Sequence, residues 1–216
     1  MPMNSRETIL SKLRSTPKPF PNVVAPTVYL PMSPLVGTER AALKARFIRE
    51  AELLSCRVYE PQSDDEAAQI VLDILSDDEQ VVAWDMEQIP FRPLAATLYD
   101  RGITAVVPGD PSVRVGITGA DAALAATGSV VLSSGSGQYR GPSLLSAVHV
   151  VFITQDLILP HMESWLSLQR QDNLESFRES SNIVVISGPS RTADIAMELI
   201  LGMHGPRAVH IIILSE

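Results

Sequence analysis

Apolar and polar residues alternate in blocks along most of this 216-residue chain. Short apolar runs, typical of buried strands, are separated by longer segments in which apolar residues recur every three or four positions, as in amphipathic helices. The strongest helical patterns cover residues 37–55, 63–76, 93–102 and 159–180. Predicted strands lie at residues 56–61, 80–85, 103–109, 113–118, 129–133, 144–154, 182–187 and 209–214.

This alternation predicts an α/β fold with three layers around a mixed, largely parallel sheet. We expect Ile183–Ser187 and His210–Leu214 to lie in one sheet, because both runs are apolar throughout. A right-handed crossover through a helix from about Ser190 to Leu201 would join them. Between Val113 and Ser133 the regular alternation of strands and helices is interrupted, because two predicted strands flank a very short helix at Asp121–Ala126. This predicts some antiparallel pairing of strands.

The N-terminal region differs from the rest of the chain. Residues 4–14 have a helical pattern, and the many prolines from Ser15 to Pro34 exclude a helix and most central strands. We therefore predict that residues 1–35 form a helix followed by an extended segment. Residues 36–216 are predicted to form a single α/β domain.

Charge and composition narrow the function. A formal net charge of −8 disfavours nucleic-acid binding, which needs a basic face. The single cysteine, Cys56, permits no internal disulfide and cannot hold an iron–sulfur cluster. The four histidines form no metal-binding motif, so we predict neither a metal site nor a bound cofactor. The N-terminus lacks a signal-peptide core and no run approaches the roughly 18 apolar residues of a membrane span, so we expect a cytoplasmic protein.

The first candidate site is the segment "GPSRTAD", which follows a predicted strand. Backbone N–H groups at such a turn favour an anion, and Arg191 adds a charge that can hold a carboxylate or phosphate. Ser190 and Thr192 add hydroxyl groups. A purely structural interpretation is that Pro189 opens a helix and Asp194 complements its dipole. The segment is not a Walker loop, because the Gly-Lys-Ser/Thr ending is absent.

A second candidate is the glycine-rich segment "ITGADAALAATGSVVL". Asp121 and Thr127 lie at the ends of its predicted short helix, and Asp121 is the best candidate for a positioned base. A cap followed by a hairpin loop is the structural alternative. No nucleophile elbow is present, and the sequence identifies no catalytic residue. We expect the two glycine-rich turns to surround one pocket at the carboxyl ends of the strands.

These segments, together with "SLLSAVHVVFI" and "LGMHGPRAVHIIIL", resemble the lactate-utilization protein C family, whose members have a LUD domain. The resemblance covers Val115–Leu214 and implies a fold like that of glucosamine-phosphate isomerase, ribose-phosphate isomerase and CoA-transferase. This chain has Thr127-Gly128-Ser129 where the family usually has Thr-Gly-Thr, so a hydroxyl is kept. Carried over from the family's motifs, the ligand-binding residues would be Thr118, Gly119, Asp121, Thr127, Gly188, Ser190, Arg191 and Thr192.

The resemblance also implies a role in oxidising L-lactate to pyruvate together with iron–sulfur partner proteins, which would carry the electrons. The chain would then be an accessory component that binds its partners and a small organic anion. The alternative is a stand-alone enzyme or sensor that binds a phosphosugar, a CoA ester or another small anion. Fold analogy is a weak basis for that chemistry.

Overall fold

The computed structural model describes residues 5–17, 37–106, 110, 112–193 and 199–215. The chain divides into two compact units, Met1–Leu30 and Pro31–Glu216. In the first unit, helix α1 (Ser5–Ser15) forms where the sequence predicts it, with no buried residue. Most of the proline-rich segment lies outside the described residues, and the predicted boundary after residue 35 stays a prediction.

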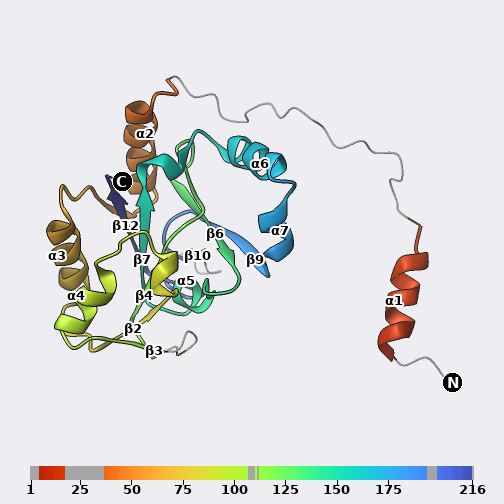
Figure 1. The fold of residues 1–216 in the computed structure, drawn as a ribbon, viewed down its shortest axis with the longest axis horizontal. Helices are drawn as coiled ribbons and strands as arrows, with labels where there is room; N and C mark the ends of the chain where they lie inside the picture. The colour runs from red at the N-terminus through yellow and green to blue at the C-terminus, as the bar shows by residue number, and fades with distance from the viewer. Residues whose placement is uncertain (1–4, 18–36, 107–109, 111, 194–198, 216) are drawn as a thin grey trace. The chain divides into compact units, whose positions relative to one another are not determined.

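The second unit is built on a six-stranded sheet in which every pairing is parallel (Figure 1). In spatial order its strands are β1 (Arg57–Tyr59), β12 (Ala208–Leu214), β7 (Val148–Thr154), β4 (Val115–Thr118), β2 (Gln80–Ala83) and β3 (Thr104–Val106). The connecting helices are α2 (Arg40–Leu53), α3 (Asp64–Leu75), α4 (Leu94–Asp100) and α5 (Gly141–Leu144). The largely parallel α/β fold predicted from the sequence is confirmed.

Helices cover both faces of this sheet. Gly116 on β4 lies so close to α5 that an added Cβ would overlap the backbone of Pro142. The neighbouring residue Val115 points to the other face, because side chains alternate along a strand. On that second face, Val148 lines a cavity together with Ile70 and Ile74 of α3. The sheet is therefore the middle of three layers.

A second, four-stranded sheet continues from the first. Its order is β8 (Ile158–Leu159), β5 (Ala122–Leu124), β6 (Ser129–Ser134) and β9 (Asn182–Ile186). β6 pairs antiparallel with β5 and with β9, so the predicted antiparallel pairing is confirmed. Two helices, α6 (Met162–Gln171) and α7 (Glu175–Glu179), follow β8, and Trp165 of α6 is buried against β5 and β6. Short 3₁₀ turns, η1 (Met86–Gln88) and η2 (Gln155–Leu157), follow β2 and β7.

The predicted helix at Asp121–Ala126 is wrong. Ala122–Leu124 form strand β5, and every residue from 122 to 126 is buried. Alanine has a high helix propensity, but the contacts of β5 with β6 and β8 decide the outcome here. Gly128, with φ of +64°, ends the β5–β6 connection as a left-handed turn residue.

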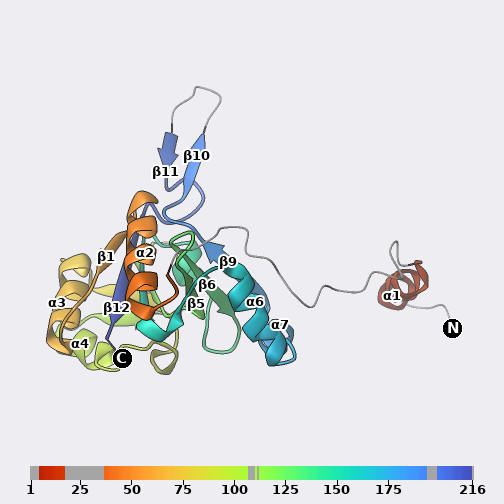
Figure 2. The same ribbon diagram turned by 90° about the horizontal axis from the view of Figure 1, so that it is seen from above.

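The predicted helix from Ser190 to Leu201 is also wrong in the described residues. β10 (Arg191–Ala193) and β11 (Leu199–Leu201) form an antiparallel hairpin that projects from the body of the unit (Figure 2). Residues 194–198 lie outside the described part. A 12-residue helix would hold its ends about 16 Å apart. Instead, the Gly202 N–H donates to the Ser190 carbonyl at 2.9 Å, so the two ends of the segment meet.

The prediction that Ile183–Ser187 and His210–Leu214 share a sheet is wrong as well. Residues 183–186 lie in β9 of the four-stranded sheet, whereas His210–Leu214 belong to β12 of the six-stranded sheet. An apolar run indicates burial but does not say which sheet provides it. The crossover through a helix is therefore absent from these described segments.

Candidate functional site

The predicted residues at the end of β4 and directly after it lie at the carboxyl edge of the six-stranded sheet. Thr118 is fully buried, and its Oγ1 lies 2.9 Å from His149 Nε2. It therefore belongs to the interior. At Gly119, an added Cβ would lie 2.9 Å from the carbonyl oxygen of Gln88, so glycine permits the close approach of the η1 turn.

Asp121 is the chemically distinctive group at this edge. Burial raises the pKa of its carboxyl above the usual range, although hydrogen bonds with Ser133 act in the opposite direction. Its Oδ2 atom is buried and has no hydrogen-bond partner among the residues that the structure describes. A partly buried carboxyl with a raised pKa and an unsatisfied oxygen suits proton transfer better than anion binding.

Groups from two other loops lie near the η1 turn. An added Cβ at Gly137 would lie 2.9 Å from Asp85 Oδ2, and the Asp85 N–H donates to the Gly137 carbonyl at 2.8 Å. The Asp85 carboxylate raises the pKa of the Tyr139 hydroxyl by its charge and by a hydrogen bond. We call Asp121 and Ser133 the Asp121 cluster, while Asp85 and Tyr139 form a separate pair at the loop around Gly137.

The residues predicted from "GPSRTAD" lie elsewhere, against the C-terminal end of α2. The exposed Arg191 side chain donates through Nη2 to the Leu54 carbonyl and to Ser55 Oγ, both at 2.6 Å. Gly188 has φ of +82°, and an added Cβ would lie 2.6 Å from the Leu54 oxygen. Because a helix C-terminus carries partial negative charge, Arg191 also stabilises the end of α2.

Thr127 also lies near the C-terminal end of α2, where its hydroxyl group is the first in a row of three hydrogen-bonded hydroxyl groups. Ser129 Oγ donates to Thr127 Oγ1 at 2.9 Å and lies 2.8 Å from Ser187 Oγ. The glycine beside it, Gly128, packs directly on the backbone of α2 at Ala51. We call Thr127, Ser129, Ser187, Arg191 and Ser55 the Arg191 cluster.

The other two predicted residues of this segment have structural roles in the hairpin. The Ser190 N–H donates to the Pro206 carbonyl at 2.8 Å, and its Oγ accepts a long 3.4 Å hydrogen bond from the His204 N–H. Thr192 pairs with Ile200 across β10 and β11.

The expectation of a single pocket is wrong, because the two clusters contact opposite ends of β6. Ser129 belongs to the Arg191 cluster and Ser133 to the Asp121 cluster, and four residues of extended chain span about 13 Å. A small anion cannot contact both clusters at once. The structure therefore divides the predicted site into one part with an exposed cation and one part with a buried acid.

The sequence analysis did not predict that four further residues lie at these sites: Asp85, Tyr139, Ser133 and Ser55. Asp85 had a usable signal, since it directly follows an apolar strand and carboxyl ends of parallel strands meet at one edge. The contact of Ser55 with Arg191 joins residues 136 positions apart, and no local pattern indicates it.

Two general findings concern the described residues only. No group of three or more His, Cys, Asp or Glu side chains is arranged there to hold a metal ion. Within the same part of the chain, no helix is long and apolar enough to cross a membrane.

Comparison with known proteins supports the resemblance seen in the sequence. Residues 111–214 match the LUD domain family, as the motifs predicted. A crystal structure of a DUF162 family protein from Deinococcus radiodurans matches with a TM-score of 0.62 at 17% identity, covering 83% of this chain and all of that one. This likeness supports the fold. The implied resemblance to the isomerase and CoA-transferase group is consistent with it and stays a prediction.

Several relatives named lactate utilization protein C confirm the resemblance seen in the sequence. The protein from Halalkalibacterium halodurans is 41% identical over 100 residues, covering 46% of this chain and 44% of that protein. The Bacillus subtilis protein is 36% identical over 103 residues, covering 48% and 43%. The Macrococcus caseolyticus protein is 30% identical over 143 residues, covering 62% and 61%. The matches thus span less than two thirds of each relative.

Proposed function

We propose that this chain is an accessory component of lactate utilization and that it binds a small organic anion at the Arg191 cluster. The names of its relatives support the pathway. The observation that carries the binding site is the anchored guanidinium of Arg191. Anion binding is favoured by a cation whose position is fixed before the ligand arrives.

The geometry of Arg191 supports this role. Its Nη2 atom uses both hydrogens on Leu54 and Ser55, which holds the planar group against α2. A guanidinium has five N–H donors, so Nε and Nη1 still carry three of them. The side chain is exposed, and Thr127 adds an exposed hydroxyl group at the same end of β6. A carboxylate can therefore accept charge-assisted hydrogen bonds without burial of an unpaired charge.

The division of labour with iron–sulfur partners follows from redox chemistry. Oxidation of L-lactate to pyruvate releases two electrons and two protons, which an acceptor must take up. The single cysteine cannot hold a cluster, and burial raises the pKa of the Cys56 thiol to about 11, so it stays protonated. We infer that the electrons pass to iron–sulfur partner proteins and that this chain contacts those proteins, the substrate or both.

Replacing Arg191 by glutamine should weaken binding of L-lactate and pyruvate about tenfold or more, since a charge-assisted hydrogen bond contributes roughly 1.5–3 kcal/mol. The free energy of unfolding should fall by only about 0.3–1 kcal/mol, the usual contribution of a cation at an exposed helix C-terminus. Calorimetric titration and urea denaturation measure the two effects separately. Arg178→Gln, which removes an exposed arginine of α7, is the matched control. Unchanged affinity in Arg191→Gln would leave Arg191 with only its helix-capping role.

The Asp121 cluster supports a second candidate, a stand-alone enzyme that acts on a phosphosugar or a CoA ester. A carboxyl with a raised pKa can accept and return a proton next to a carbonyl group. Its unsatisfied Oδ2 and the nearby polar groups are the observation that favours this candidate.

If Asp121 is such a base, the isolated chain should exchange a carbon-bound proton of its substrate with deuterium from the solvent. Asp121→Asn should lower the exchange by at least about a hundredfold, as general-base catalysis contributes 10²–10⁴. NMR of sugar phosphates and CoA esters incubated with the chain in deuterated water would detect the exchange. Asp100→Asn, an exposed aspartate at the end of α4, is the control. Absence of exchange across both substrate classes would eliminate this candidate and leave the accessory role.

A further inference from the structure

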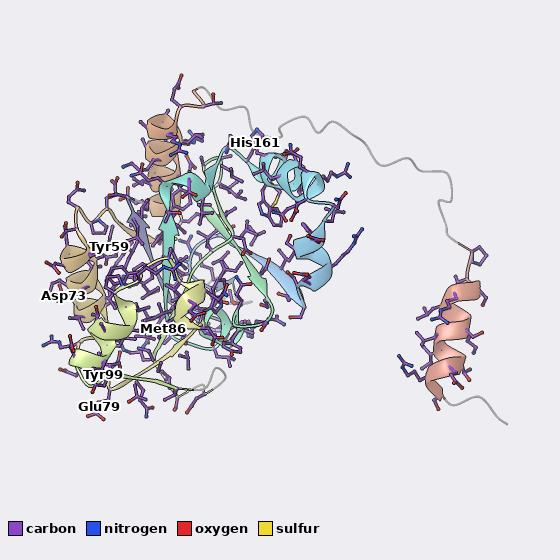
Figure 3. All side chains as sticks on the ribbon, in the orientation of Figure 1. Tyr59, Asp73, Glu79, Met86, Tyr99 and His161 are labelled. Carbon is purple, nitrogen blue, oxygen red and sulfur yellow. The ribbon has the colours of Figure 1, made fainter. Side chains whose placement is uncertain are left out.

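A cavity of about 420 Å³ lies between α3 and the six-stranded sheet, at the end of the sheet where the parallel strands begin. The β1–β12–β7 register places its sheet residues on one face. Arg57 pairs with His210, and Ala208 pairs with Val148, while Tyr59 is two residues beyond Arg57. Ile70, Asp73 and Ile74 of α3 form the opposite wall. Figure 3 labels Tyr59 and Asp73, both beside α3.

A buried polar pair forms part of the cavity wall. His210 is only 4% exposed, and its Nδ1 lies 3.0 Å from Tyr59 Oη. The two rings are nearly parallel, with centroids 5.8 Å apart. Burial, followed by the charges of Arg57 and Arg114, lowers the pKa of His210 to about 4, so the imidazole is neutral at pH 7.

The two arginines of the cavity have different surroundings. Arg114 is fixed: its Nε donates to Asp78 Oδ2 at 2.9 Å, and its Nη2 donates to the carbonyls of Ile74 and Leu75. The Arg57 side chain makes no hydrogen bond or ion pair with any residue in the described ranges, although it lines the same cavity. Its guanidinium is thus the cation available to a ligand there.

Asp73 limits which anion fits. It lies on the α3 wall, and its Oδ1 accepts a hydrogen bond from Gln69 at 2.7 Å. Together with Asp78, which neutralises Arg114, it disfavours a dianion such as phosphate. A single carboxylate can face Arg57 while a hydroxyl or ammonium group on the same molecule donates to Asp73. The isoleucines of α3 would contact an apolar side chain.

We propose that this cavity, which we call the Arg57 pocket, is a second ligand site for a monocarboxylate that carries a hydrogen-bond donor and an apolar side chain. A 2-hydroxy acid and a 2-amino acid share this chemistry. The pocket is separate from the Arg191 and Asp121 clusters, and the inference does not depend on the proposed function. Its volume lies within the range usual for small-molecule sites.

Three matched probes test the proposal on the full chain: 2-hydroxy-4-methylpentanoate, L-leucine and 4-methylpentanoate, which lacks the donor. We expect calorimetric titration to show that at least one donor-bearing acid binds more tightly than 4-methylpentanoate and than inorganic phosphate. If 2-hydroxy-4-methylpentanoate binds more tightly than L-leucine, the natural ligand is a hydroxy acid; the reverse order indicates an amino acid. Absence of binding by both donor-bearing acids up to about 10 mM would overturn the proposal.

Single substitutions show which site the ligand occupies. Arg57→Gln should weaken it about tenfold or more, because it removes the charge-assisted contact. Asp73→Asn should remove the preference over 4-methylpentanoate. Arg92→Gln, at an exposed arginine before α4, should change nothing. If Arg191→Gln rather than Arg57→Gln abolishes binding, the ligand occupies the Arg191 cluster and the pocket assignment is wrong. Both arginines are exposed, so neither variant threatens the fold.

Discussion

Replacing Gly128 by alanine is expected to lower the free energy of unfolding by about 2–5 kcal/mol. The left-handed backbone at φ of +64° accounts for about 1–2 kcal/mol of that loss. The rest arises because the added methyl group would overlap the backbone of α2 at Ala51, and overpacking of this kind costs about 1–3 kcal/mol. Urea denaturation followed by circular dichroism measures the change.

Gly102 provides a matched control for that experiment. It has a similar φ of +71°, but an added Cβ would meet nothing within 4 Å. Gly102→Ala should therefore cost only the backbone component, about 1–2 kcal/mol. Equal losses at the two positions would show that the β5–β6 connection does not pack on α2. In that case Thr127 and Arg191 would not be held at one place, and the Arg191 cluster would lose its basis.

Stability should also fall steeply in mild acid, and His149 should be a main cause. This side chain is completely buried on β7, and burial lowers its pKa to about 3. Histidine in the unfolded chain has a pKa near 6.5, so below that value the unfolded state binds a proton that the folded state does not. The contribution of His149 is therefore fully present above about pH 6.5 and is lost as the pH falls towards 3, by up to about 1.4 kcal/mol per pH unit.

The effect of His149 can be separated from that of other groups. His210 acts in the same direction down to about pH 4, so the wild-type slope contains both residues. Unfolding free energies of the wild type and of His149→Gln at pH 7.5, 6 and 5 should converge as the pH falls. If the variant does not fold, the NMR signal of the His149 ring in the wild type gives the same information. A titration of that ring near pH 6.5 would contradict its burial against Thr118.

Local patterns were sufficient for much of this fold. Helices α3 and α4 form within the predicted ranges 63–76 and 93–102, and the apolar runs of β7 and β12 are buried strands. The sequence patterns gave wrong predictions where tertiary contacts outweigh the intrinsic helix propensity of a segment. Residues 122–124 have helical composition but are held between β6 and β8.

The sequence could place some of the candidate residues in the fold, but it could not predict how they lie relative to one another. Asp121 lies at the carboxyl edge, as expected for a residue that follows a parallel strand. The position of Arg191 depends on the hairpin and on the end of α2, which is 137 residues away in sequence. Periodicity carries no information on such a contact, and therefore the separation of the two clusters could not be foreseen.

Calorimetric titration of L-lactate into the wild-type chain and into Arg191→Gln tests the central claim most directly. We expect saturable binding to the wild type, weakened about tenfold or more in Arg191→Gln and unchanged in Arg178→Gln. Equal affinity of wild type and Arg191→Gln, or no binding of lactate or pyruvate to the folded wild type, would contradict the assignment of the Arg191 cluster as an organic-anion site.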